Sequence, residues 1–154
     1  MMQQPSLLTK TGRLTFLLLL VNAIGYIASS YMTKETMVWY AALPQSNLTP
    51  PPIVFGIVWT VLLFLQALAA FLVWGKTSPR YFVLQLALNM LWSFVFFYLR
   101  LPAIALIIVL LFILALIINI KVFGKANRWA GWLLVPTFLW SLFAIYLNAF
   151  IVFS

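Results

Sequence analysis

The sequence predicts an all-α integral membrane protein, a bundle of five transmembrane helices with no soluble domain. Of its 154 residues, 66% are hydrophobic and only 6% are charged, and its mean hydropathy is +1.15. A soluble domain carries about 25% charged residues, so a chain of this size could not hide so much apolar surface from water. The lengths of the apolar stretches and the positions of the basic residues support the same conclusion.

Each of five apolar stretches is long enough to cross the hydrocarbon core of a bilayer, which takes about 20 helical residues. Backbone groups in lipid must be satisfied internally, so each stretch is expected to be a helix, and the unalternating runs argue against a barrel. The stretches are Leu14–Met32, Ile53–Trp74, Tyr81–Leu99, Ala103–Ile120 and Trp132–Phe153. The fourth is apolar except for Asn119 and is expected to face lipid most. One connection, Thr33–Pro52, is long.

Basic residues flank the spans unequally. Two of them, Lys34 and Arg100, lie on the side of the membrane that carries the long loop. The opposite side carries the other seven, Lys10, Arg13, Lys76, Arg80, Lys121, Lys125 and Arg128. Cytoplasmic loops carry the excess of Lys and Arg, so the N-terminus is expected in the cytoplasm and the C-terminus outside. Without a barrel or a clear cleavable signal, the expected location is the cytoplasmic (plasma) membrane of a prokaryote. Basic residues spread over span ends do not indicate a nucleic-acid partner.

The composition excludes most enzyme chemistry. The chain contains no His and no Cys, and Glu35 is its one acidic side chain. Paired-carboxylate, Ser–His–Asp and Cys–His sites are therefore absent, as are His- or Cys-ligated metals and haem. We expect no catalytic residue, no metal and no cofactor. Because no charged residue lies well inside a span, ion-coupled transport is also disfavoured.

Polar and large aromatic residues recur at helical spacing, which gives most spans a distinct inward face. Amides inside membrane helices commonly hydrogen-bond across helices, and we interpret Asn22, Gln66 and Asn119 in this way. A second set is open to two interpretations, helix packing or a ligand pocket with apolar walls and a few polar groups. This set comprises Asn89, Trp92, Trp140 and Asn148, together with Trp59.

The long loop carries Trp39 and Tyr40, and then the run Thr49-Pro50-Pro51-Pro52. Consecutive prolines fix φ and hold the backbone extended, and a proline also suits the first turn of the next helix. The loop is either a stiff connector or a lid over the pocket.

The motifs that carry a family resemblance occur in order along the whole chain. They are Trp39-Tyr40-x-x-Leu43, Thr49-Pro50-Pro51 with Phe55-Gly56-x-Val58-Trp59, Gln85-Leu86-Ala87-Leu88-Asn89-x-x-Trp92, and Leu133-Leu134-x-Pro136-x-x-x-Trp140-x-x-x-Ala144-x-x-Leu147-Asn148. Together they resemble the translocator protein and tryptophan-rich sensory protein (TSPO) family, once called peripheral benzodiazepine receptors.

The resemblance implies a five-helix bundle, often a homodimer, with a cavity under the first long loop that binds protoporphyrin IX, sterols and benzodiazepine-type ligands. It places ligand contacts at Trp39, Tyr40, Pro50, Pro51, Asn89, Trp92, Trp140, Ala144, Leu147 and Asn148. The spans contain no GxxxG motif that would by itself indicate a dimer.

The expected function is a membrane receptor for tetrapyrroles and related hydrophobic ligands, with a transport or regulatory role. The alternatives are a light-dependent porphyrin-degrading photo-oxidase that uses Trp140, or an accessory membrane protein without a small ligand. The chain departs from the family pattern at Ser46, Leu48, Leu63, Ile108 and Thr137. Leu48 stands where relatives carry a loop Trp, so we expect ligand binding with weakened or absent degradation.

Overall fold

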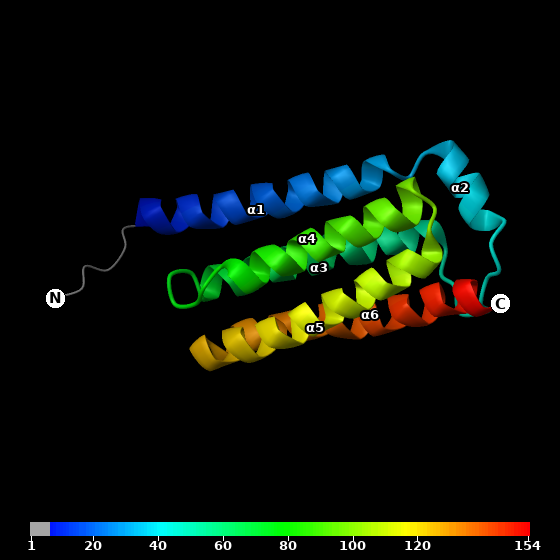
Figure 1. The fold of residues 1–154 in the computed structure, drawn as a ribbon. Coiled ribbons are helices and arrows are strands. Elements are labelled where there is room, and N and C mark those ends of the chain that lie inside the picture. Colours follow the sequence, from blue (N-terminus) through cyan, green and yellow to red (C-terminus); the bar gives the residue numbers. More distant parts are fainter. Residues whose placement is uncertain (1–6) are drawn as a thin grey trace.

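A computed structural model describes residues 7–154 as a bundle of long helices (Figure 1). Five helices are long and apolar enough to cross a membrane, which confirms the predicted fold class. They are α1 (Leu7–Ser30), α3 (Pro52–Leu72), α4 (Arg80–Ser93) with its π-helical continuation η1 (Phe94–Tyr98), α5 (Pro102–Ala126) and α6 (Arg128–Phe153). Several of them extend past the predicted spans, because hydropathy marks the apolar core of a helix and misses its turns in the interface.

A short helix, α2 (Lys34–Ala41), occupies the first part of the loop that was expected to lack regular structure. Thr33 caps it: the Thr33 hydroxyl accepts a hydrogen bond from the backbone N–H of Thr36 at 3.2 Å. A side-chain oxygen at this position satisfies one of the free N–H groups of the first turn. Helix α2 lies across one end of the bundle, at the far end from the first turn of α1 (Figure 1).

Helices α3 and α5 begin with a proline in the first turn, at Pro52 and Pro102. This position suits proline, because the missing N–H would have no helical partner there. Asn127 separates α5 from α6, and its side-chain oxygen accepts from the N–H of Trp129 at 2.9 Å. The last two spans are thereby joined by a one-residue turn, which keeps them side by side.

Helix α5 is more buried than α1, α3 and α6, so the expectation that it faces lipid most was wrong. It packs against α4 and α6, and its buried residues are Ala105, Ile108, Val109, Phe112, Ile113, Ala115, Leu116, Asn119 and Phe123. Among the described side chains of α1, in contrast, the buried hydrophobic ones are Leu17, Val21 and Ile24. Hydropathy cannot separate a lipid-facing helix from a buried one, because both faces are apolar.

Helices α5 and α6 approach most closely at two glycines. A Cβ atom built on Gly131 would lie 2.9 Å from the Cα of Gly124 and 3.1 Å from the carbonyl oxygen of Ile120. No side chain fits at Gly131 without moving the α5 backbone. Small residues at such contacts allow the backbones of membrane helices to pack directly.

A chain of three buried amides joins α3, α4 and α5. The Gln85 amide donates to Gln66 Oε1 at 2.7 Å, and the Asn119 amide donates to Gln85 Oε1 at 2.7 Å and to the carbonyl of Tyr81 at 2.9 Å. All three side chains are fully buried. Interhelical bonding is thus confirmed for Gln66 and Asn119, whereas Asn22 donates to Leu18 of its own helix.

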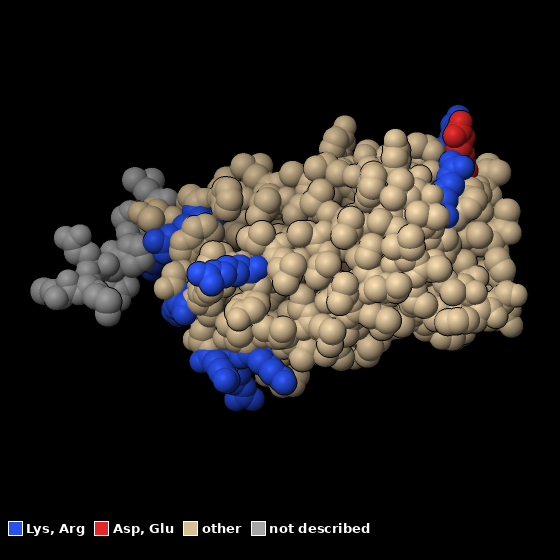
Figure 2. Space-filling model, in the orientation of Figure 1, with Lys and Arg blue, Asp and Glu red and all other residues tan. Residues whose placement is uncertain are grey.

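The charged residues occupy the two ends of the bundle (Figure 2). The end formed by the start of α1, the α3–α4 turn and the α5–α6 turn is basic, and Lys34, Glu35 and Arg100 lie at the end covered by α2. Between them the described surface is an apolar band, as a bilayer requires. We call these two halves of the molecule the basic half and the α2 half.

Candidate ligand cavity

A cavity of about 590 Å³ lies in the α2 half, between α1, α3 and α4. The wall from α1 includes Asn22, Tyr26 and Ser29, and Met37 contributes from α2. This volume falls within the range of roughly 300–1,000 Å³ that is usual for small-molecule sites.

The inner wall of the cavity carries two tryptophans and one amide, namely Trp59 of α3 and Trp92 and Asn89 of α4. Asn89 is buried, and its side chain makes no hydrogen bond within the described residues. A buried amide without a protein partner is costly unless something else satisfies it. The lining residues include no charged side chain. The site therefore suits an apolar, flat molecule that offers Asn89 a hydrogen bond.

Trp92 and Asn148 are held in place by a relay from α4 to the start of α5. The Trp92 indole N–H donates to Asn148 Oδ1 at 3.3 Å, and the Asn148 amide donates to the carbonyl of Pro102 at 2.9 Å. That carbonyl lies in the first turn of α5. Both side chains are buried. The relay fixes the orientation of the Trp92 ring at the cavity wall, so Asn148 positions Trp92.

A smaller pocket of about 30 Å³ adjoins the main cavity. The two share Met32, Pro52, Phe55, Trp92 and Phe97 as lining residues. Its remaining wall comes from η1, α2 and α6. This wall contains four further residues that the sequence assigned to ligand binding: Tyr40, Ala144, Leu147 and Asn148.

The other four predicted ligand residues lie outside both spaces. Trp39 packs edge-on against Phe96 at a centroid distance of 5.8 Å. Pro50 and Pro51 form the extended approach to α3. Trp140 packs against Phe55 at 5.7 Å, and its buried indole N–H has no hydrogen-bond partner in the described structure. Phe55 lines both spaces, and Trp140, which contacts it, lines neither.

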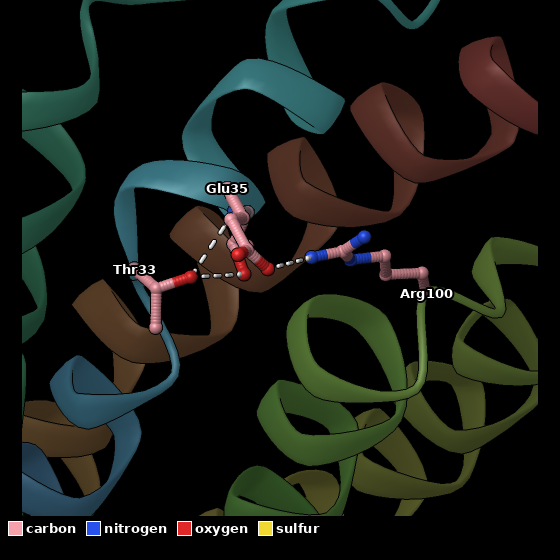
Figure 3. A network of polar contacts seen from close by, with 4 residues as sticks. Thr33, Glu35 and Arg100 are labelled. Carbon is pink, nitrogen blue, oxygen red and sulfur yellow. Dashed lines mark hydrogen bonds and ion pairs between the residues drawn. The ribbon is translucent and has the colours of Figure 1, made fainter.

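Helix α2 forms the roof of the cavity and is joined to the end of η1 by Arg100 (Figure 3). The Arg100 guanidinium lies 3.8 Å from the Glu35 carboxylate and 5.9 Å from the centre of the Trp39 ring. Its backbone is left-handed, with φ of 58°, a conformation that is costly for a residue with a side chain. On the inner face of α2, burial raises the pKa of the Tyr40 hydroxyl above its usual value.

The rest of the loop is attached to α6. The Ser46 and Tyr146 hydroxyls are 2.7 Å apart, so the residue that departs from the family pattern at position 46 makes a contact of its own. Leu48 points away from the protein, with 65% of its surface exposed, and lines neither space. Leu63, a further departure from the family pattern, is one of the residues that line the cavity.

Sequence reasoning missed Gly56, Thr60 and three methionines of the cavity wall, Met32, Met37 and Met90. Gly56 and Thr60 follow Pro52 at a spacing of four residues and precede Leu63, so the helical period of α3 carried the signal. Methionine gives no such signal, because it is equally common in cores.

Five apolar helices of membrane length, with a ligand-sized cavity at the end covered by a loop helix, define a small helical membrane protein. Residues 17–153 match the TspO/MBR family, and the chain belongs to that family. It is 34% identical to the tryptophan-rich protein TspO of Archaeoglobus fulgidus over 138 residues, 85% of this chain and 89% of the relative. It is 34% identical to the tryptophan-rich sensory protein of Cereibacter sphaeroides over 139 residues, 88% and 85% of the two chains. Identity to the human translocator protein is 31% over 132 residues, 80% and 78% of the two chains.

Proposed function

We propose that this membrane protein is a receptor for tetrapyrroles of the protoporphyrin IX type. The main observation in support is the cavity of about 590 Å³, in which the unpaired amide of Asn89 lies among tryptophan rings. The porphyrin macrocycle is large, flat and largely apolar, and aromatic walls favour such a ring. A propionate oxygen at the edge of the macrocycle can accept the hydrogen bond that the Asn89 amide does not make within the described protein.

The expected orientation places the cavity in the outer half of the bilayer. If the basic end faces the cytoplasm, as the charge bias of membrane proteins favours, α2 and the C-terminus lie on the external side of a prokaryotic plasma membrane. Ligand would then be exchanged in the outer leaflet. Cleavage by an added protease in the loop at Gln45–Thr49, in sealed right-side-out vesicles, tests this placement.

Titration in the dark tests the proposal. Protoporphyrin IX is added to the purified, detergent-solubilised protein while tryptophan fluorescence is followed, for the wild type, Asn89→Leu and Asn47→Leu. Asn47 is exposed in the loop and serves as the matched amide control. A lost hydrogen bond of about 0.5–1.5 kcal/mol raises Kd roughly 2- to 12-fold for Asn89→Leu, and Asn47→Leu leaves it unchanged.

Two results would contradict the proposal. Quenching that rises linearly without saturation, and equally in all three proteins, means that the pigment dissolves in the micelle. Saturable binding with the same Kd for Asn89→Leu means that the ligand lies elsewhere. In the first case the remaining alternative is an accessory protein, which predicts co-purification with another membrane protein.

Light-dependent porphyrin degradation receives less support from the geometry. Trp140 lines neither the main cavity nor the smaller pocket, and Leu48 is exposed. We therefore expect illumination in the presence of oxygen to destroy bound porphyrin slowly in the wild type. An altered product spectrum under light that disappears in Trp140→Phe would favour the photo-oxidase instead. Loss of porphyrin at a rate unaffected by Leu48→Trp would refute a role for the missing loop tryptophan.

A further inference from the structure

The cavity has an open side between α1 and α3. The lining residues of its inner wall, Asn89, Trp92 and Ser93, are buried, whereas those nearest the α1–α3 gap are exposed. Tyr26 is the extreme case, with 77% of its surface exposed. The exposed lining residues are Asn22, Tyr26 and Ser29 on α1, and Pro52, Gly56 and Thr60 on α3. We call these six residues the rim of the slot.

The slot begins where the close packing between α1 and α3 ends. At the lower end of the slot, a Cβ atom on Gly25 would lie 3.3 Å from Leu63. At the other end of α1, Tyr31 packs against Phe94 and Tyr98 with ring-centre distances of 5.7 and 5.9 Å. The end of α1 nearest α2 is thus held against η1, and the gap is left on the side of α3.

The slot faces lipid rather than water. Exposed apolar side chains flank it on both helices, including Ile27, Ile53 and Ile57. The polar rim groups donate to their own helix: Ser29 to the carbonyl of Tyr26 at 2.8 Å and Thr60 to that of Gly56 at 2.8 Å. Such local bonds make hydroxyl groups tolerable in lipid. An apolar molecule in the bilayer therefore meets an open slot whose Ser29 and Thr60 hydroxyls already donate hydrogen bonds.

We infer that the slot between α1 and α3 is a portal through which a hydrophobic ligand passes sideways between the bilayer and the cavity. The inference rests on the proposed receptor function and adds the source of the ligand, which is the membrane and not the aqueous phase. The α2 roof does not open for this exchange. Its contacts with η1 and the Ser46–Tyr146 bond stay intact while ligand moves.

Gly56 offers a direct test, because a Cβ atom there meets nothing within 4 Å. Gly56→Phe places a ring across the slot without displacing a neighbour. Gly12→Phe is the matched control, since Gly12 is an exposed glycine of α1 that also has open space around it. Each protein is placed in lipid nanodiscs and mixed rapidly with protoporphyrin IX carried in vesicles, and tryptophan quenching gives the association and dissociation rates.

For Gly56→Phe the association and dissociation rates are both expected to fall by about tenfold, which corresponds to a barrier increase of about 1.4 kcal/mol. Gly12→Phe keeps the wild-type rates. If Gly56→Phe binds saturably at the wild-type rates, the portal hypothesis is refuted and the proposed receptor function stands. A rise in dissociation rate alone would also overturn it, because Gly56 would then contact bound ligand. Absence of saturable binding to the wild type would refute the receptor itself.

A second variant avoids dependence on the folding of Gly56→Phe. The chain has no cysteine, so Tyr26→Cys can be labelled with a bulky thiol reagent after purification, and rates are compared before and after labelling. Leu139→Cys, on the exposed face of α6, is the control. Labelling is expected to slow exchange only at position 26, and equal effects at both positions would overturn the portal.

Discussion

Replacing Gln85 by leucine is expected to destabilise the bundle more than replacing its partner Gln66. Gln85 is the middle member of the buried amide chain, and it both donates to Gln66 and accepts from Asn119. The direction of the chain is fixed at one end, because the carbonyl of Tyr81 can only accept. Reversing the amides would leave that carbonyl without the Asn119 donor.

The expected magnitude follows from the number of broken bonds. Interhelical hydrogen bonds in membranes contribute about 0.6 kcal/mol on average and at most about 1.7. Gln85→Leu removes two and leaves Gln66 Oε1 buried without a donor, which costs a further 1–3 kcal/mol or so. We expect a loss of about 2–4 kcal/mol in unfolding free energy. Gln66→Leu breaks one bond but also removes the unpaired Gln66 Nε2, so it costs less.

The triple variant Gln66→Leu, Gln85→Leu, Asn119→Leu sharpens the test. It breaks every hydrogen bond among the three amides. It also removes the two atoms of these amides that are buried without a partner in the described structure, Gln66 Nε2 and Asn119 Oδ1. Because no polar group of the chain is left unpaired, we expect the triple variant to lose less stability than Gln85→Leu alone.

Reversible unfolding in mixed detergent–SDS micelles, followed by tryptophan fluorescence, measures these differences. Asn22→Leu is the control, since the Asn22 amide is exposed and bonds only its own helix. Equal stability of Gln85→Leu and Asn22→Leu would refute the reasoning, as would a triple variant whose loss equals the sum of the three single losses.

Three further outcomes are expected. Gly131→Ala lowers the thermal melting temperature, because the new Cβ would lie 2.9 Å from the Gly124 Cα of α5, and this outweighs the gain of about 1 kcal/mol in helix propensity. Gly124→Ala does not lower it, because the nearest atom to its Cβ, the Gly131 Cα, is 3.9 Å away. Tyr146→Phe breaks the 2.7 Å bond to Ser46, so an added protease cleaves the α2–α3 loop faster than in the wild type, and unchanged cleavage would contradict this role. Since burial raises the pKa of the Tyr40 hydroxyl above its ordinary value of 10.0, the unfolded chain loses this proton at a lower pH than the folded chain, and stability falls as pH rises above that value. An ultraviolet titration of the wild type against Tyr40→Phe should show one phenolate that forms at a higher pH than usual, and a normal midpoint would refute this.

The number and order of the spans were predictable, because each contains an uninterrupted apolar run of membrane length. Helix α2 was not, since the prolines after it drew attention to an extended loop. Thr33 at a cap position was the available signal. The burial of α5 was also beyond the sequence, because only contacts with α4 and α6 distinguish it from a helix in lipid.

For the cavity, the helical spacing of Asn89 and Trp92 correctly indicated an inward face. The same argument placed Trp140 on a ligand wall, whereas Trp140 lines neither space and its ring contacts Phe55. Spacing identifies the face of a helix and gives no information on which neighbour covers that face. For the same reason it could not reveal the slot, which depends on where α1 and α3 separate.

The two halves of the molecule differ in how their sequence is constrained. The amide chain and the glycine contact both lie in the basic half, where a single altered atom leaves a polar group unpaired or forces two backbones apart. The α2 half instead contains a volume that protein atoms do not fill, so many side chains of different size fit around it. Divergence can therefore alter ligand preference there without threatening the fold, and a search for altered specificity is best confined to the cavity wall.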